Sequence, residues 1–397
     1  SFGSASVCLP QPCASGVRRR GSMAATMSWI AFGDRGVAKL IEAISVPGAG
    51  AEPKARETRT ALATLSSLLS NQEQKMLCLA KDGAVVPVLT SLLTSTDHEV
   101  RRQSALILGS LALVFQGRMA ISNANSVTAL ITVLGKPDPE AGVREAAAAA
   151  MLSLSESRDG CSALLQAEYV VGTLTLALKD SHLPVVRNAL GALANVLRLD
   201  LGVSEALDTG ITPLLKGLLV ESKIDDGMIE KTLQALWNLA NTPDGKRSAI
   251  EEGLLPLLGS LMAESRSPNV RRLAAGCTMA VTIDKQGKLQ SAPCATPLVD
   301  LLVDPESDAP TIRDAVGAIK NISEYPKARK HIDKYVRASG ASEQYSNMMD
   351  KPMYDHRQWP ASFRYEHQNV APAGTAADSE AEVRDRWGYP APFRASS

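Results

Sequence analysis

The stretch Asp180–Asn195, DSHLPVVRNALGALAN, decides the fold. It opens with polar residues and a proline that signal a helix start, continues with the apolar-basic pair Val186-Arg187, and ends on an asparagine. Equivalent pairs recur along the chain with steps of 43, 43, 43, 41 and 42 residues. The six pairs are Val100-Arg101, Val143-Arg144, Val186-Arg187, Ile229-Glu230, Val270-Arg271 and Ile312-Arg313. A helical pattern with a period near 42 residues is typical of an α-solenoid, in which each unit contacts only its neighbours.

Each repeat is expected to hold several helices joined by a sharp corner. The corner is marked by Gly83 with Pro87, and the same join returns at Gly210 with Pro213, at Gly253 with Pro256, and at Ala295 with Pro297. The alanine run 146–150 combines high helix propensity with small size, so we expect it inside the stack.

We make two further predictions about the residues of these pairs. The six apolar members are expected to be buried at equivalent places, and each arginine is expected to pair with a carboxylate of a neighbouring unit. Glu230 stands where the other repeats have arginine, and Lys231 is the expected substitute.

Composition excludes several classes of protein. The 397 residues include 42 basic and 42 acidic residues, so the net charge of zero does not suit a nucleic-acid binder. Hydrophobic residues make up 45% and aromatic residues only 4%, which suits the packing of aliphatic helices. No apolar run reaches the roughly 18 residues of a membrane span. The six cysteines show no paired spacing, which favours a reducing compartment.

No catalytic or metal-binding pattern is found in the sequence. The five histidines are scattered, and neither a nucleophile elbow, a phosphate-binding loop nor a zinc-protease motif occurs. We therefore expect a protein that is not an enzyme, has no cofactor, metal or small-molecule substrate, and binds other proteins.

The two ends of the chain differ from the repeats. Residues 1–28 are expected to be a disordered or non-native leader. They contain no acidic residue and include Arg18–Arg20, so they fit either a mitochondrial transit peptide or sequence upstream of a start at Met23. Residues 29–53 are predicted to form a capping helix and loop, 54–336 the repeats, and 337–397 an extended tail rich in aromatic residues and proline.

The tail 337–397 is predicted to be a docking segment. It holds eight of the sixteen aromatic residues and has a net charge of only −1, from seven basic and eight acidic residues. A segment without helical or alternating periodicity cannot bury these rings in a core of its own. We expect it to lack long helices and to lie on partner subunits or on the outer surface of the solenoid, with five anchors. The anchors are Trp359, Phe363, Tyr365, Trp387 and Tyr389.

The period, the G-x-x-x-P-x-L corner and the ALANV, ALWNLAN and AIKNIS helices resemble armadillo repeats over residues 35–336. The resemblance implies an all-α, right-handed α-solenoid of about seven repeats. In armadillo proteins the residues that match Asn195, Asn238 and Asn321 bind the backbone of an extended peptide. Four residues earlier, import adaptors carry tryptophan, whereas this chain has Gly191, Gln234 and Gly317, which argues against basic cargo. The alternative role of the asparagines is to hold the stack together.

A narrower resemblance rests on IAFGDRGVAKL and NQEQKMLCLAKDGAVVPVL, which are similar to the armadillo proteins of ciliary radial spokes. It implies a non-catalytic scaffold subunit of the axoneme in motile cilia. The front end and the aromatic tail have no counterpart in that pattern. Two alternatives therefore stay open: a soluble adaptor that binds extended peptide cargo, and an accessory subunit of an organellar complex.

Overall fold

The computed structural model describes residues 35–45, 52–80, 83–135, 138–220, 224–265 and 267–349. Within these ranges the chain forms helices and short connections and contains no strand. The predicted all-α class is confirmed. The fold is a right-handed α-solenoid of the armadillo type.

The helices form one capping helix and seven triplets. The capping helix is α2 (Gly36–Ser45), and the first triplet is α3 (Glu52–Leu68), α4 (Gln72–Cys78) and α5 (Val85–Leu92). The next three are α6 (His98–Ala112), α7 (Phe115–Asn123) and α8 (Ser126–Gly135); α9 (Ala141–Ser155), α10 (Arg158–Leu165) and α11 (Val170–Ala177); and α12 (Leu183–Val196), α13 (Asp200–Asp208) and α14 (Ile211–Val220). The last three are α15 (Asp226–Ala240), α16 (Pro243–Glu251) and α17 (Leu254–Glu264); α18 (Pro268–Val281), α19 (Lys285–Gln290) and α20 (Ala292–Val303); and α21 (Ala309–Ser323), α22 (Pro326–Ala338) and α23 (Ser342–Met349).

Polar side chains cap the start of four of the long first helices, α6, α15, α18 and α21. The Asp97 carboxylate accepts hydrogen bonds from the backbone N–H groups of Glu99 and Val100, and Asp225 accepts one from Met228. Ser267 caps α18 and Asp308 caps α21 in the same way. These caps satisfy N–H groups that the first turn of a helix leaves without an intrahelical partner.

The corner between the second and third helices is made by a residue with left-handed backbone. Gly83, Gly210 and Gly253 have φ values of 73°, 64° and 63°, as the sequence predicts for glycine at these places. The fourth predicted corner, at Ala295, is wrong, because α20 begins at Ala292 and contains Pro297 in its interior. Ser291, at φ −79°, connects α19 to α20 instead.

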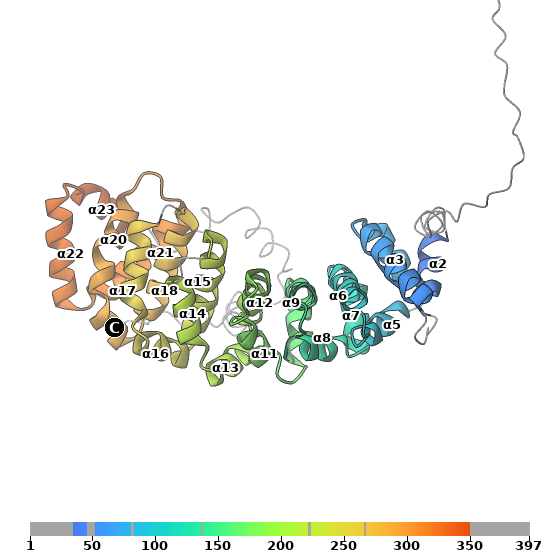
Figure 1. Cartoon of the computed structure of the whole chain (residues 1–397). Helices are drawn as coiled ribbons and strands as arrows, with labels where there is room; N and C mark the ends of the chain where they lie inside the picture. Colours follow the sequence, from blue (N-terminus) through green and yellow to red (C-terminus); the bar gives the residue numbers. More distant parts are fainter. Residues whose placement is uncertain are drawn as a thin grey trace, which may run out of the picture.

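The triplets stack in a curved row. Contacts link α3 to α6, α6 to α9, and each later long helix to the next, ending with α18 and α21. Figure 1 shows these long helices along the inner side of the curve, with the shorter helices α5, α8, α11, α13 and α14 on the outer side. We call the side of α6, α9, α12, α15, α18 and α21 that lies along the inside of this curve the inner face. Each of these helices has a long helix on both flanks except α21, after which the described residues contain no further triplet.

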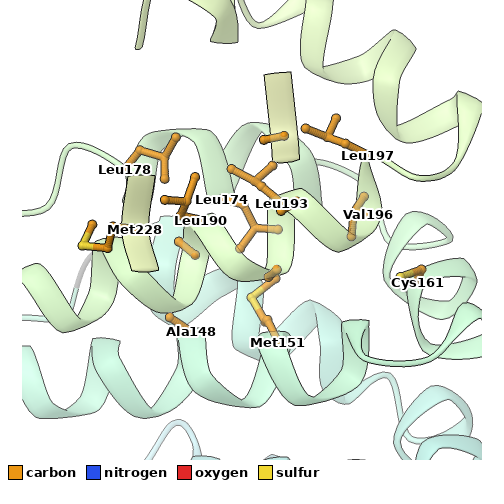
Figure 2. Packing of buried hydrophobic residues seen from close by; sticks show 14 of the residues in the cluster. Ala148, Met151, Cys161, Leu174, Leu178, Leu190, Leu193, Val196, Leu197 and Met228 are labelled. Atoms are coloured by element: carbon orange, nitrogen blue, oxygen red, sulfur yellow. The ribbon is translucent and has the colours of Figure 1, made fainter. Parts of the chain in front are cut away.

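Aliphatic side chains from consecutive triplets fill the space between the helices. Figure 2 shows Leu174 of α11 close to Leu190 and Leu193 of α12, with Met151 of α9 beside them. All four are fully buried. The alanine run 146–150 lies in the stack as predicted: a Cβ built on Gly109 of α6 would come within 3.0 Å of the Ala150 backbone. Small residues thus let neighbouring long helices approach closely.

Four of the six apolar pair members occupy equivalent buried places: Val100, Val143, Val186 and Val270. The prediction is wrong for Ile229 and Ile312, which are only half-buried against the core. In α15 and α21 the residue just before the apolar member, Met228 or Thr311, takes the buried position.

The helical array also continues beyond the predicted boundary at residue 337. That boundary falls inside α22, and α23 follows after Gly340, whose φ of 71° repeats the corner geometry of earlier units. Contacts of α23 with α20, α21 and α22 make it the third helix of the seventh triplet. The predicted extended tail therefore does not include residues 342–349.

Candidate interaction surface

A row of arginine–aspartate pairs joins consecutive triplets. Arg144 donates to Asp180 from Nε at 2.6 Å and from Nη2 at 2.9 Å. Arg101 bonds Asp138 through the same atoms at the same distances. Each carboxylate lies in the connection that leads into the next long helix. The further pairs are Arg59–Asp97, Arg187–Asp225 and Arg271–Asp304. The predicted pairing with neighbouring units is confirmed for Arg101, Arg144, Arg187 and Arg271, and it is wrong for Arg313, which pairs within its own helix.

The arginines also tie down the connections of their own triplets. Nη1 of Arg144 donates to the backbone carbonyls of Asp138 and Pro139, at 2.6 and 3.3 Å. The hydrogen bond from Arg144 holds the pKa of the Asp180 carboxyl below its usual value, and the same bond raises the pKa of Arg144. This pair therefore stays charged at neutral pH and links α9 to the connection before α12.

The row of pairs has a break at α15. Glu230 accepts a hydrogen bond from the Ser267 hydroxyl at 3.4 Å, so a serine stands where the other pairs have aspartate. Lys231 does not act as the predicted substitute, because its ammonium donates to Gln234 within the same helix.

Arg313 also differs from the arginines that pair with a neighbouring triplet. It pairs with Asp314, the next residue of its own helix, at 2.8 Å. Asp314 is fully buried and its Oδ2 has no hydrogen-bond partner within the described chain. Burial raises the pKa of this carboxyl.

The three asparagines bind the preceding triplet. Nδ2 of Asn238 donates to the Ala194 carbonyl at 3.0 Å, and Nδ2 of Asn321 donates to the Met279 carbonyl at the same distance. Asn195 donates to the Ser155 hydroxyl, also at 3.0 Å. The stack-holding role left open by the sequence is thus present in the structure. All three side chains are half-buried on the inner face.

Close helix packing explains why no tryptophan ladder accompanies these asparagines. A Cβ on Gly191 would lie 2.9 Å from a methyl group of Leu152, and one on Gly317 would lie 2.4 Å from the sulfur of Met279. A larger side chain at either position would collide with the preceding long helix. Trp237 points elsewhere, as expected, because its ring covers Gly276 of α18.

Basic residues also stand on three of the long helices, and of these the sequence analysis singled out only Lys231. Lys231 and Lys320 are exposed, and Arg272 is half-buried. Lys231 and Arg272 share one repeat position, two residues after the apolar pair member. That register could have found them, because it places both about two helical turns before the asparagine position.

Several predicted features lie outside the residues described. The five tail anchors, Trp359, Phe363, Tyr365, Trp387 and Tyr389, fall in the undescribed stretch 350–397. The whole of the leader 1–28 also lies outside the described residues. Among the described residues no cluster of three or more potential metal ligands occurs. None of the helices there combines the length and the apolar character that crossing a membrane requires.

Comparison with known proteins supports the fold. No protein-family model matches the chain, and no curated protein matches it. An engineered protein of known structure is 24% identical, with a TM-score of 0.67 over 75% of this chain and 71% of its own. A designed armadillo repeat protein is 20% identical, with a TM-score of 0.55 over 62% of this chain and 99% of its own. Another, solved in complex with the peptide (KR)4, has a TM-score of 0.54 at 20% identity over the same shares. The chain therefore has the fold of the armadillo-repeat proteins.

Proposed function

We propose that the chain is a non-catalytic scaffold subunit of a large assembly, most specifically of the radial spoke in the axoneme of motile cilia. The observation that supports a scaffold is the continuous inner face, formed by six long helices that ion pairs and asparagine bonds hold in line. Such solenoids supply extended binding surfaces. The ciliary assignment depends on the sequence resemblance of residues 30–40 and 71–89 alone.

Localisation tests the ciliary assignment. A tagged chain that begins at Ser1 and one that begins at Met23 are expressed in cells with motile cilia. Both are expected along the axoneme. Import of the Ser1 chain into mitochondria would favour the organellar accessory subunit, and a diffuse or nuclear distribution of both chains would contradict the axonemal proposal.

A soluble adaptor for extended peptides is the second candidate. A designed relative of the same fold binds a peptide, and the asparagines of this chain keep their Oδ1 atoms as possible acceptors for a peptide N–H. An adaptor would exchange its cargo, whereas a spoke subunit would stay bound. Recovery of fluorescence after photobleaching of the tagged chain separates these two behaviours.

A further inference from the structure

The second helix of the last triplet, α22, differs in charge from the other second helices. It contains five lysine and arginine residues and one acidic residue, whereas α13, three triplets earlier, contains three acidic residues and no basic one. At 13 residues, α22 is also longer than α16, which has nine, and α19, which has six. The positive charge is therefore a property of this helix and not of the repeat.

The basic residues line the solvent side of α22. Ile332 and Val336 are buried in the core, and four exposed cations lie on the opposite side of the helix, spaced so that they share one face. They are Lys327, Lys330, Lys334 and Arg337, at intervals of three, four and three residues. We call these four residues the cationic row, which extends about 15 Å along the helix.

The protein itself does not neutralise the cationic row. Among the described residues, none of the four side chains has a carboxylate within ion-pair distance. Asp300 accepts a hydrogen bond from a tyrosine of α22, and Glu324 pairs with a lysine of α19. Asp333 and Glu343 are exposed, so α22 and α23 together carry five basic and two acidic residues.

The position of α22 leaves the cationic row accessible. The helix stands at the end of the stack, and no further triplet follows it among the described residues (Figure 1). The last unit of a solenoid needs polar side chains to stay soluble, but side chains of both signs would serve that purpose. No large apolar side chain is exposed on α21, α22 or α23, so this end does not suit the packing of another apolar repeat. A surface of one sign instead favours a partner of the opposite sign.

We propose that the cationic row of α22 binds a short acidic segment of a partner protein. Carboxylates of that segment pair with the lysine and arginine side chains. The exposed side of α22 has no aromatic or long aliphatic side chain that could enter a bilayer or stack on a nucleobase, because Ile332, Tyr335 and Val336 pack against the core. Since α22 is not one of the helices of the inner face, the inference goes beyond the proposed function and does not depend on what that face binds.

Peptide binding to the full chain tests the charge preference. Fluorescence anisotropy is measured with labelled (Glu-Ser)4 and (Lys-Ser)4. The acidic peptide is expected to bind at least about tenfold more tightly, and its affinity should fall as salt rises from about 50 to about 200 mM. Equal or tighter binding of the basic peptide would overturn the inference.

Charge reversal locates the contact on α22. The double variant Lys330→Glu/Lys334→Glu is expected to lose about tenfold or more in affinity for (Glu-Ser)4. The matched control Lys39→Glu/Lys179→Glu makes the same charge change at exposed positions on α2 and after α11, and should stay within about twofold. An equal loss in both variants would refute the placement.

Removing the acidic residue of α22 gives a test in the direction of tighter binding. Asp333→Asn should tighten the binding of (Glu-Ser)4 by about twofold to threefold. If thermal melting shows that charge reversal unfolds the chain, Lys330→Gln/Lys334→Gln should give a smaller loss of affinity in a folded protein. Unchanged affinity in both Asp333→Asn and the glutamine variant would overturn the proposal.

Other occupants of the cationic row give different results, and each of them would overturn the proposal. Neutralising the acidic stretch after residue 377 by Asp378→Asn/Glu380→Gln/Glu382→Gln would tighten peptide binding more than about tenfold if the chain's own tail covered the row. Self-association that Lys330→Glu/Lys334→Glu abolishes would indicate a second copy. Phosphatidylserine vesicles or a thymidine dodecamer that bind through these lysines, while (Glu-Ser)4 does not, would indicate a lipid or nucleic-acid surface.

Discussion

Arg144 and Asp180 form a bidentate ion pair across the boundary between α9 and α12, with both side chains only 11% exposed. The equivalent pair one triplet later, Arg187 and Asp225, is 54% and 50% exposed. The same kind of ion pair therefore lies in two environments, one shielded from water and one exposed to it. Removing one partner destabilises the fold more in an ion pair that is shielded from water than in an exposed pair, because the remaining charge stays desolvated.

The two arginines are therefore expected to differ in their effect on stability. Arg144→Met leaves Asp180 without its partner and should lower the free energy of unfolding by about 3 kcal/mol. Arg187→Met should cost less than about 1 kcal/mol. Urea unfolding of both variants beside the wild type measures the difference. Equal losses would show that exposure does not set the contribution of these pairs.

Stability should also depend on pH through Asp180. Because the folded state lowers its pKa, the carboxylate contributes stability above its unfolded pKa of about 3.9, and this contribution is lost as pH falls through the lower folded value. Asp180→Asn should therefore flatten the rise in stability between about pH 2 and pH 5. Comparing the variant with the wild type isolates this group from Asp314, whose raised pKa acts in the opposite direction. Parallel stability curves would contradict the assignment.

The break at Glu230 and Ser267 can be converted into a regular pair. Ser267→Asp alone places a carboxylate opposite Glu230 and should destabilise, whereas the double variant Glu230→Arg/Ser267→Asp should recover wild-type stability or exceed it by less than about 1 kcal/mol. Glu230→Arg alone should change little. A double-mutant cycle from thermal melts gives the coupling. A coupling of zero would mean that the two side chains do not face each other.

Substitution by alanine is expected to change the free energy of unfolding in opposite directions at Gly276 and at Gly217. A methyl group there would lie 2.6 Å from the Trp237 ring, so Gly276→Ala should destabilise by about 1–3 kcal/mol. Gly217 lies inside α14, is exposed and has nothing within 4 Å of its Cβ position, so Gly217→Ala should stabilise by about 0.5–1 kcal/mol. Chemical denaturation of the two variants is the measurement. Destabilisation by both would show that the glycines matter for another reason.

Two truncations separate α23 from the segment after it. Ending the chain at Met349 should leave the melting temperature almost unchanged. Ending it at Ser339 removes α23, including Tyr345 and Met349, which pack against the core, and should lower it. We place the start of the tail at residue 350 instead of 337, because the seventh triplet includes this helix. A large loss from the shorter deletion would place part of 350–397 in the fold.

The repeat was predictable because its signals are local and occur six times. The pairs, the glycine corners and the alanine run each mark a position that helix geometry then fixes. The prediction failed at Ile229 and Ile312, where the preceding residue takes the buried position, and at Lys231, which bonds Gln234 of its own helix. Helix α23 was missed because SEQYSNMM lacks the many aliphatic residues of the other third helices, although Gly340 marked its corner.

The candidate surface was only partly predictable. The asparagine positions followed from the period, but their bonds to the preceding triplet depend on how the helices stack. The aspartates that pair with the arginines recur at or shortly before the start of the next long helix, so the same period could have identified them.

Quantification of the chain in isolated, salt-washed axonemes tests the proposed scaffold role most directly. The tagged full chain is measured by mass spectrometry relative to tubulin, beside a chain that ends at Met349. The account predicts that the full chain stays in the axoneme at a fixed ratio to tubulin that does not change with its expression level, and that the truncated chain, although folded, is largely lost. A full chain that washes out completely, or whose amount follows expression without saturating, would contradict a structural role in the axoneme.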